Sequence, residues 1–169
     1  GRQPVTIYRA AFVQEQPMTS FDITRAPGRT YRYYTGKPLF PFGSGLSYST
    51  FALGDPAPRA ELKDGRVKVE AMISHVDGPP GDCVLLVYHR VSSNIRAELN
   101  YPVPLRNLVD FTRVALLRGA SSHVQLSVDL EGFYLTTPNG TKVLPSGEHV
   151  LEINVGTGAK TEEVIVVIP

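Results

Sequence analysis

Sixteen acidic side chains, four histidines and one cysteine are the residues of this chain that could do acid–base, metal or nucleophilic chemistry. The histidines show no short metal-ligand spacing and have no cysteine partners, so the sequence predicts no metal site. Glu148 and His149 could form an acid–base pair, but adjacent residues of a strand point to opposite faces. We interpret them as a turn charge and a half-exposed strand residue. Cys83 stands in an apolar run, which is typical of a buried thiol rather than a nucleophile.

The glycine and serine motifs do not complete a cofactor or nucleophile site. Gly43-Ser44-Gly45 could suggest a phosphate cradle, but no Lys-Ser/Thr follows with the spacing of a nucleotide motif. No serine lies in the glycine pattern of a nucleophile elbow. We therefore expect no catalytic, cofactor-binding or metal-binding residue in this chain.

Residues 27–51 hold seven of the fifteen Tyr and Phe residues of the chain. Their prolines exclude a regular helix, so this stretch is predicted to be a rigid, extended connector. In an extended chain Tyr31 and Tyr33 share one side, and Arg32 and Tyr34 the other. Such rings either pack against a neighbouring domain or stack on a sugar. The candidates for both roles are Tyr31, Tyr33, Tyr34, Phe40 and Phe42.

The elements that must position these rings follow the connector, where residues 52–169 show short alternating segments separated by turn signals. Residues 67–73 and 124–130 alternate apolar with polar, as half-buried strands do. The apolar run at residues 84–88 predicts the most buried, central strand. Tyr48 and Phe51 are expected to enter the core. The fold class is all-β, an immunoglobulin-like antiparallel β-sandwich of about seven strands that carries an extended, aromatic-rich N-terminal arm.

Pro138-Asn139-Gly140-Thr141 lies between two apolar segments and predicts a tight hairpin, because Asn-Gly readily adopts positive φ angles. Asn139 is also an acceptor for N-glycosylation if the protein passes through a eukaryotic secretory route.

Two motifs of the connector resemble a known junction. GRTYRYY at residues 28–34 and PFGSGLSY at residues 41–48 look like the segment of glycoside hydrolase family 3 enzymes that leads into their C-terminal fibronectin type III-like domain. The similarity is strongest to the β-xylosidase and α-arabinofuranosidase branch. It extends upstream and downstream through residues 1–6, 17–19, 77–84, 108–114 and 147–149.

This resemblance implies a division of the chain. Residues 1–26 would be the incomplete tail end of an α/β sandwich domain, residues 27–51 the connector, and residues 52–169 a fibronectin type III-like β-sandwich. The run Val5 to Tyr8 would be the last strand of a sheet whose other members are missing. Asp22 and Arg25 lie in a loop that could face the family's active site, although solvated loop charges explain them more simply.

The resemblance also implies a borrowed function. Family members carry the nucleophile aspartate in a barrel domain and the acid/base outside the part matched here, so we expect this chain alone to be inactive. Its partners would be the missing barrel and α/β sandwich domains, which it would brace, and carbohydrate would be contacted only indirectly. The parent would hydrolyse O-glycosyl bonds, as an exo-β-1,4-xylosidase does in xylan breakdown. The alternative is a free-standing carbohydrate-binding or adhesive module that uses Tyr31, Tyr33 and Tyr34.

Charge and hydropathy exclude other partners. Seventeen basic and sixteen acidic residues are spread without blocks, which disfavours nucleic acid and anionic membranes. No apolar run approaches the length of a membrane span, and the polar start Gly1-Arg2-Gln3-Pro4 is not a signal peptide. An extracellular location is expected from the resemblance only.

Overall fold

Two long strands, β3 (Arg66–Asp77) and β4 (Gly81–Val91), lie at the centres of two sheets in the computed structural model, which describes residues 1–156 and 160–169. In β3 the alternation puts Val67, Val69 and Ile73 inside, at no more than 1% exposure. In β4 the apolar run is buried on both faces, as predicted for a central strand.

The first sheet is built on both edges of β3. Strands β1 (Thr50–Leu53) and β2 (Arg59–Lys63) pair with the two halves of one edge, and β6 (Ser121–Asp129) pairs with the other. All three pairings are antiparallel.

The second sheet has the order β10-β9-β4-β5 and is also antiparallel throughout. Its outer members are β5 (Asn107–Leu116), β9 (Gly147–Asn154) and β10 (Glu162–Ile168). A two-stranded hairpin, β7 (Leu135–Thr136) with β8 (Lys142–Val143), stands apart. The described residues also form short helices: α1 (Phe12–Glu15), α2 (Thr30–Tyr33), α3 (Ser93–Glu98) and the 3-10 turn η1 (Leu130–Phe133).

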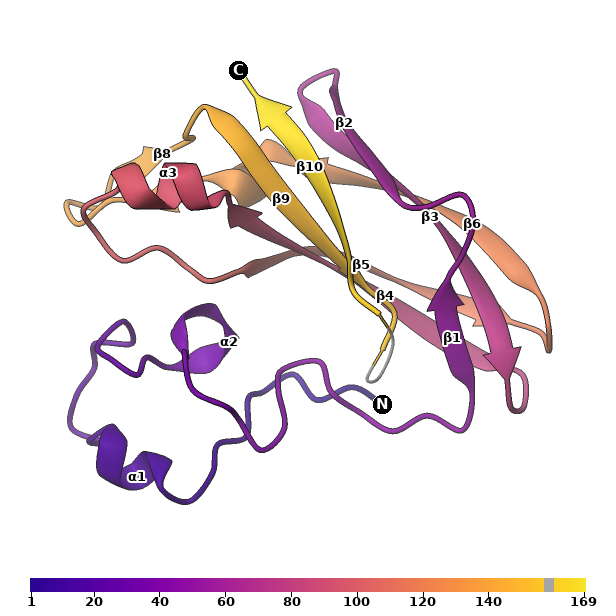
Figure 1. The fold of residues 1–169 in the computed structure, drawn as a ribbon, viewed down its shortest axis with the longest axis horizontal. Helices are drawn as coiled ribbons and strands as arrows, with labels where there is room; N and C mark the ends of the chain where they lie inside the picture. Colours follow the sequence, from indigo (N-terminus) through magenta and orange to yellow (C-terminus); the bar gives the residue numbers. More distant parts are fainter. Residues whose placement is uncertain (157–159) are drawn as a thin grey trace.

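The two sheets face each other across one apolar core, so the all-β antiparallel sandwich expected from the sequence is confirmed (Figure 1). In the described part of the chain the two sheets contain eight strands, against about seven expected. The sequence analysis did not predict β2. This edge strand is rich in charged residues, and its two apolar side chains, Ala60 and Leu62, are only partly buried. The largest core side chains come from both sheets and η1: Ile73, Leu85, Phe133, Leu151 and Ile153.

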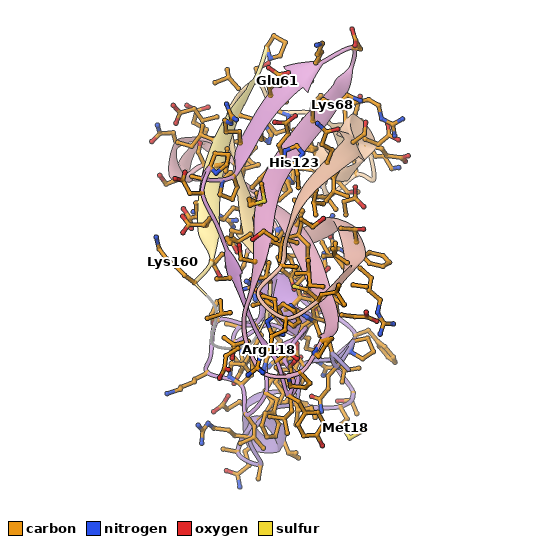
Figure 2. All side chains as sticks on the ribbon, turned by 90° about the vertical axis from the view of Figure 1, so that its right-hand side faces the viewer. Met18, Glu61, Lys68, Arg118, His123 and Lys160 are labelled. Carbon is orange, nitrogen blue, oxygen red and sulfur yellow. The ribbon has the colours of Figure 1, made fainter. Side chains whose placement is uncertain are left out.

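The outer faces of the two sheets differ in polarity. The outer face of β3 and β6 carries polar side chains such as Lys68, which donates to the Ser127 hydroxyl, and the exposed His123, both labelled in Figure 2. The outer face of β4 instead carries Leu86 and Tyr88, which are 7% and 3% exposed. Something other than the opposite sheet must therefore cover β4.

Residues 1–49, here called the arm, cover it (Figure 1). Within the arm, residues 3–7 and 39–44 lie side by side and exchange backbone hydrogen bonds, including an isolated bridge between Ile7 and Phe40. The prediction that residues 27–51 are extended throughout is wrong at α2, where residues 30–33 form a single helical turn. The turn fits because no proline lies between Pro27 and Pro38.

No helix among the described residues is both long enough and apolar enough to cross a membrane.

Candidate functional site

An aromatic junction joins the arm to the second sheet. The Tyr31 ring stacks on Phe42 with 4.3 Å between centroids, and both rings meet Tyr88 of β4 edge-on at 5.9 and 6.4 Å. The Tyr31 hydroxyl also accepts a hydrogen bond from the backbone N–H of Leu108, 3.1 Å away. Burial of Tyr88 under these rings raises the pKa of its phenol. The arm is thus packed on the sandwich through ring contacts rather than only tethered to it.

A second ring cluster lies inside the arm. Tyr8 stacks on Phe12 at 3.9 Å, and Tyr34 meets both rings edge-on at 4.9 and 5.4 Å. The expectation that Tyr31 and Tyr33 share one side is wrong. Because residues 30–33 form a helical turn, positions three apart share a side, so Tyr31 and Tyr34 line one pocket while Tyr33 points elsewhere.

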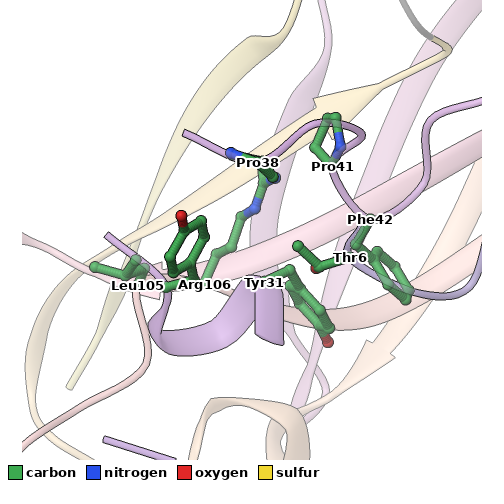
Figure 3. A pocket seen from close by; sticks show the side chains of 8 residues that line it. Thr6, Tyr31, Pro38, Pro41, Phe42, Leu105 and Arg106 are labelled. Atoms are coloured by element: carbon green, nitrogen blue, oxygen red, sulfur yellow. The ribbon is translucent and has the colours of Figure 1, made fainter. Parts of the chain in front are cut away.

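That pocket has a volume of about 240 Å³ and lies between the arm and the segment before β5 (Figure 3). Its wall is mostly apolar, and Arg106 lies against it with the guanidinium 4.6 Å from the Tyr88 ring centroid and 3.2 Å from a Glu152 oxygen. The buried Thr6 hydroxyl has no hydrogen-bond partner among the described residues. The lining consists of Thr6, Tyr31, Tyr34, Pro38, Pro41, Phe42, Leu105 and Arg106.

Of the five aromatic candidates from the sequence, three meet at this pocket: Tyr31, Tyr34 and Phe42. Phe40 is half exposed and lies outside it, while Tyr33 is half-buried with the Arg32 guanidinium 5.8 Å from its ring centroid. Sequence reasoning missed Tyr88 and Arg106. The central apolar run was a signal for Tyr88, since a tyrosine there must be covered on its outer side.

Charged side chains reinforce the same face. Glu152 of β9 accepts from Arg90 at 2.9 Å and from Arg106 at 3.2 Å, and Arg90 also reaches Glu163 at 2.9 Å. At the start of the arm, Arg2 donates to the Val84 carbonyl at 2.7 Å, and burial lowers the pKa of its guanidinium. Arg2 thus fixes the start of the arm to β4, whereas the Glu152 pairs tie β4, β9, β10 and the segment before β5 to one another.

The arm also exposes large apolar side chains. Tyr48 was expected to enter the core, but it is 95% exposed, because it lies before β1 begins at Thr50, whereas Phe51 inside β1 is buried as expected. Phe21 and Leu46 are 94% and 97% exposed. The exposed apolar set of the arm is Val5, Val13, Met18, Phe21, Ile23, Leu39, Phe40, Leu46 and Tyr48. Such a set is unusual for a surface that faces only water.

The titratable candidates do not form a catalytic pair. Glu148 is exposed and His149 is fully buried, which confirms that they point to opposite faces but corrects the expectation that His149 is half exposed. His149 is buried because its strand position faces the sandwich interior, where it bonds to His89. In the described residues no three His, Cys, Asp or Glu side chains gather where a metal ion could sit. Burial raises the pKa of Cys83 to about 11, which keeps its thiol protonated and unreactive.

The remaining candidates from the sequence lie on the surface. Asp22 and Arg25 are exposed, and hydrogen bonds from Thr24 lower the pKa of the Asp22 carboxyl. Asn139 is exposed in the loop between β7 and β8, and its side-chain oxygen accepts from the backbone N–H of Thr141 at 3.2 Å. Residues 135–143 form the expected hairpin, and Gly140 has a φ of +85°, but Asn139 does not have the positive φ that the Asn-Gly interpretation assigned to it.

No protein-family model matches the chain. The chain is 33% identical over 177 residues to a probable exo-1,4-β-xylosidase of Aspergillus fumigatus, and 32% identical over 172 residues to an exo-1,4-β-xylosidase of Emericella nidulans. Both alignments cover 92% of this chain and 22% of the relative, so the chain spans about a fifth of the length of these proteins.

Solved structures share the fold. A β-glucosidase from Erythrobacter marinus superposes with a TM-score of 0.74 at 26% identity, over all of this chain and 22% of that one. A family 3 exo-β-xylosidase, solved with a xylobiose aziridine probe, superposes with a TM-score of 0.79 at 24% identity, over 98% of this chain and 24% of that one. The sandwich and the arm together are therefore matched by one part of much longer chains.

Proposed function

We propose that this chain, which is homologous to part of the glycoside hydrolase family 3 exo-xylosidases, is a non-catalytic structural module that braces the catalytic domains of such an enzyme. In this proposal residues 52–169 are a fibronectin type III-like sandwich, residues 27–51 a connector, and residues 1–26 the tail end of an α/β sandwich domain. The parent enzyme would hydrolyse O-glycosyl bonds as a secreted exo-β-1,4-xylosidase in xylan breakdown.

The observation that carries the proposal is that the arm is packed on the sandwich and yet exposes large apolar side chains. Tyr31, Phe42 and Arg2 fix it to the sandwich, while Phe21, Leu46 and Tyr48 are almost fully exposed to solvent. Removing such side chains from water favours association by about 25 cal/mol per Å² of apolar surface. An arm that is bound to the sandwich and exposes apolar side chains is suited to pack against a companion domain. It would then fix the sandwich and that domain relative to each other.

The proposal is tested by making the same substitutions in two settings. In this chain alone, Phe21→Ser and Tyr48→Ser should leave the melting temperature unchanged, because both side chains are already exposed. In the full-length enzyme, each should lower the melting temperature by several degrees, because each would then remove a buried contact. Val167→Ser, a change of a 61% exposed side chain in β10, is the control outside the arm. If all three variants kept the melting temperature of the unaltered protein in both settings, bracing by the arm would be refuted.

Activity gives a second test. The isolated chain should not hydrolyse an aryl β-xyloside, and the intact mass of the natural protein should be several times that of this chain. A native product of this size that cleaves xylosides unaided would reject the proposal.

Sugar binding by a free-standing module is the second candidate, and the aromatic-lined pocket favours it. Titration with xylo-oligosaccharides and sedimentation with insoluble xylan separate the two candidates. Under bracing, tyrosine fluorescence and sedimentation stay unchanged. Saturable binding that is lost in Tyr34→Ala, and kept in Tyr33→Ala because Tyr33 lies outside the pocket, would support the sugar-binding module instead.

A further inference from the structure

Two histidines of neighbouring strands are hydrogen-bonded to each other inside the sandwich. His89 of β4 and His149 of β9 are 4% and 0% exposed, and His89 Nε2 lies 2.7 Å from His149 Nδ1. His149 Nε2 lies 2.8 Å from the Pro145 carbonyl oxygen. Since a carbonyl only accepts, His149 must carry its proton on Nε2, which leaves its Nδ1 to accept from the Nε2–H of His89. The distances thus place a proton on Nε2 of each ring and leave Nδ1 of His149 unprotonated.

The side chains around the pair are apolar, cationic or uncharged, so they would not stabilise a positive charge on either ring. Phe133 of η1 packs on both rings, 4.3 Å from His89 and 5.7 Å from His149 between centroids. The open edge of His89 borders a narrow crevice that is also lined by Arg32 and Arg90, both cationic, and by the uncharged Asn107 and Tyr134.

The acidic side chains of the adjoining elements are paired with other cations or point away from the two histidines. Glu131 of η1 binds Lys142, and Glu152 of β9 binds Arg90 and Arg106. Glu148 is exposed on the opposite face of β9 from His149. Among the described residues, the ion pair that includes a histidine is the exposed one between His123 and Glu70. A first proton on the buried pair would therefore be an uncompensated cation, and a second would set two N–H donors against each other.

The pair lies where several short elements meet the end of the second sheet. Val91 follows His89 by two residues and Leu135 follows Phe133 by two, and both belong to a small apolar cluster apart from the main core. The Pro145 carbonyl held by His149 belongs to the segment between β8 and β9. Phe133 of η1 also packs in the main core, but β3 and β6 are held by their own ladder of nine residue pairs. Breaking the histidine bond would therefore loosen η1, the β7–β8 hairpin and this cluster before it disturbs β3 and β6.

We propose that the His89–His149 pair is an acid-sensitive latch, which holds η1 and the small apolar cluster against the sandwich while both rings are neutral and favours local opening as the pH falls. Burial, together with the neighbouring His149, lowers the pKa of His89 to about 3, and burial lowers the pKa of His149 as well. In an opened state both rings reach water and regain an ordinary pKa near 6.5. Protons therefore bind the opened state first, and opening becomes easier below pH 6.5.

Hydrogen exchange on the unaltered 169-residue chain tests the latch. Between pH 7.5 and 4.5, after correction for intrinsic exchange rates, opening at residues 130–145 should increase by on the order of 100-fold for each of the two histidines that titrates only when open. Protection in β3 and β6 should change much less. A uniform loss over both sheets, or an unchanged protection at residues 130–145, would overturn the proposal.

Substitution identifies the residue responsible. His89→Gln keeps an N–H donor for His149 Nδ1 but cannot take up a proton, so its acid-induced opening should be at least tenfold smaller than in the unaltered chain. His123→Gln removes an exposed histidine and should open like the unaltered chain. If His89→Gln does not fold, NMR titration of the unaltered protein decides: both rings should stay neutral below pH 5 while the native spectrum persists. Protonation of either ring near pH 6.5 in the native state would refute the latch.

Discussion

The hydroxyl oxygen of Tyr31 lies 3.1 Å from the backbone nitrogen of Leu108, so one side chain of the arm accepts a hydrogen bond from the second residue of β5. The same ring stacks on Phe42 and meets Tyr88. A single residue therefore combines a polar anchor with an apolar one at the junction of the arm and the sandwich.

Tyr31→Phe should lower the free energy of unfolding by about 1 kcal/mol, because it leaves the Leu108 N–H without its acceptor while the ring contacts stay. Tyr31→Ala should cost about 3 kcal/mol or more, because it also removes the ring packing. Urea unfolding measures both. Tyr33→Phe is the control, since no hydrogen bond of the Tyr33 hydroxyl is part of this junction, and an equal loss in Tyr33→Phe would contradict the assignment.

Acid should destabilise the folded chain over a defined range. The folded-state pKa of His89 is about 3, below its ordinary 6.5, so between these pH values the unfolded chain binds a proton at His89 and the folded chain does not. The stabilisation is complete above about pH 6.5 and is lost progressively down to about pH 3, to an upper limit of roughly 5 kcal/mol for this residue. Urea unfolding at several pH values measures the slope. A stability that rises as the pH falls from 6.5 to 4 would be incompatible with the buried neutral pair.

Gly28→Ala should detach part of the arm. Gly28 has a φ of +85°, and a Cβ atom there would lie 2.1 Å from the Tyr33 carbonyl oxygen, a backbone atom that cannot move aside cheaply. The expected cost is about 2 kcal/mol or more, against about 1 kcal/mol for Gly65→Ala. Gly65 is the matched control because its φ is +72° with no atom near the added Cβ. Limited proteolysis of the arm, compared between the variants, reports the detachment, and equal cleavage of both would argue against the steric cause.

Glu152→Gln should destabilise the second sheet by about 2 kcal/mol. The Glu152 side chain is only 13% exposed and binds both Arg90 and Arg106, so its loss leaves two half-buried guanidinium groups with weaker partners. Thermal unfolding measures the change. Glu131→Gln, which breaks an exposed pair with Lys142, should have no measurable effect. A comparable loss in both variants would show that burial does not set the energy.

Asn139 should carry one N-linked glycan when the protein is made in a eukaryotic secretory host. It is exposed in a hairpin loop, and Thr141 completes the acceptor pattern. Intact mass should fall by the mass of one glycan in Asn139→Gln. The same mass for both proteins would mean that the site is not used.

Much of the sandwich could be predicted from residue patterns, and the reasons are local. Alternation at residues 67–73 and the apolar run at residues 84–88 mark strands, because side chains of a strand alternate between its faces. The hairpin at residues 135–143 was marked by Gly140, which takes the positive φ that glycine tolerates. β2 was missed although its five residues alternate between polar and apolar, since Ala, Glu and Lys are uncommon in strands and the segment is short.

The candidate site was predictable only in part. Its rings were identified by their density in residues 27–51, but their grouping was wrong because a four-residue helical turn put Tyr31 and Tyr34, not Tyr31 and Tyr33, at one pocket. Tyr48 was misplaced because a ring near the start of a strand looks the same whether or not the strand includes it.

The sequence by itself determined the all-β class, the central position of β4 and the presence of an aromatic connector, because periodicity and composition are properties of neighbouring residues. Only the tertiary structure decided that the arm covers Leu86 and Tyr88, and that His89 meets His149 across sixty residues of chain. Such pairings depend on which strands become neighbours in a sheet and on what packs over them. That choice is made by the burial of the whole molecule, and no short stretch of sequence contains it.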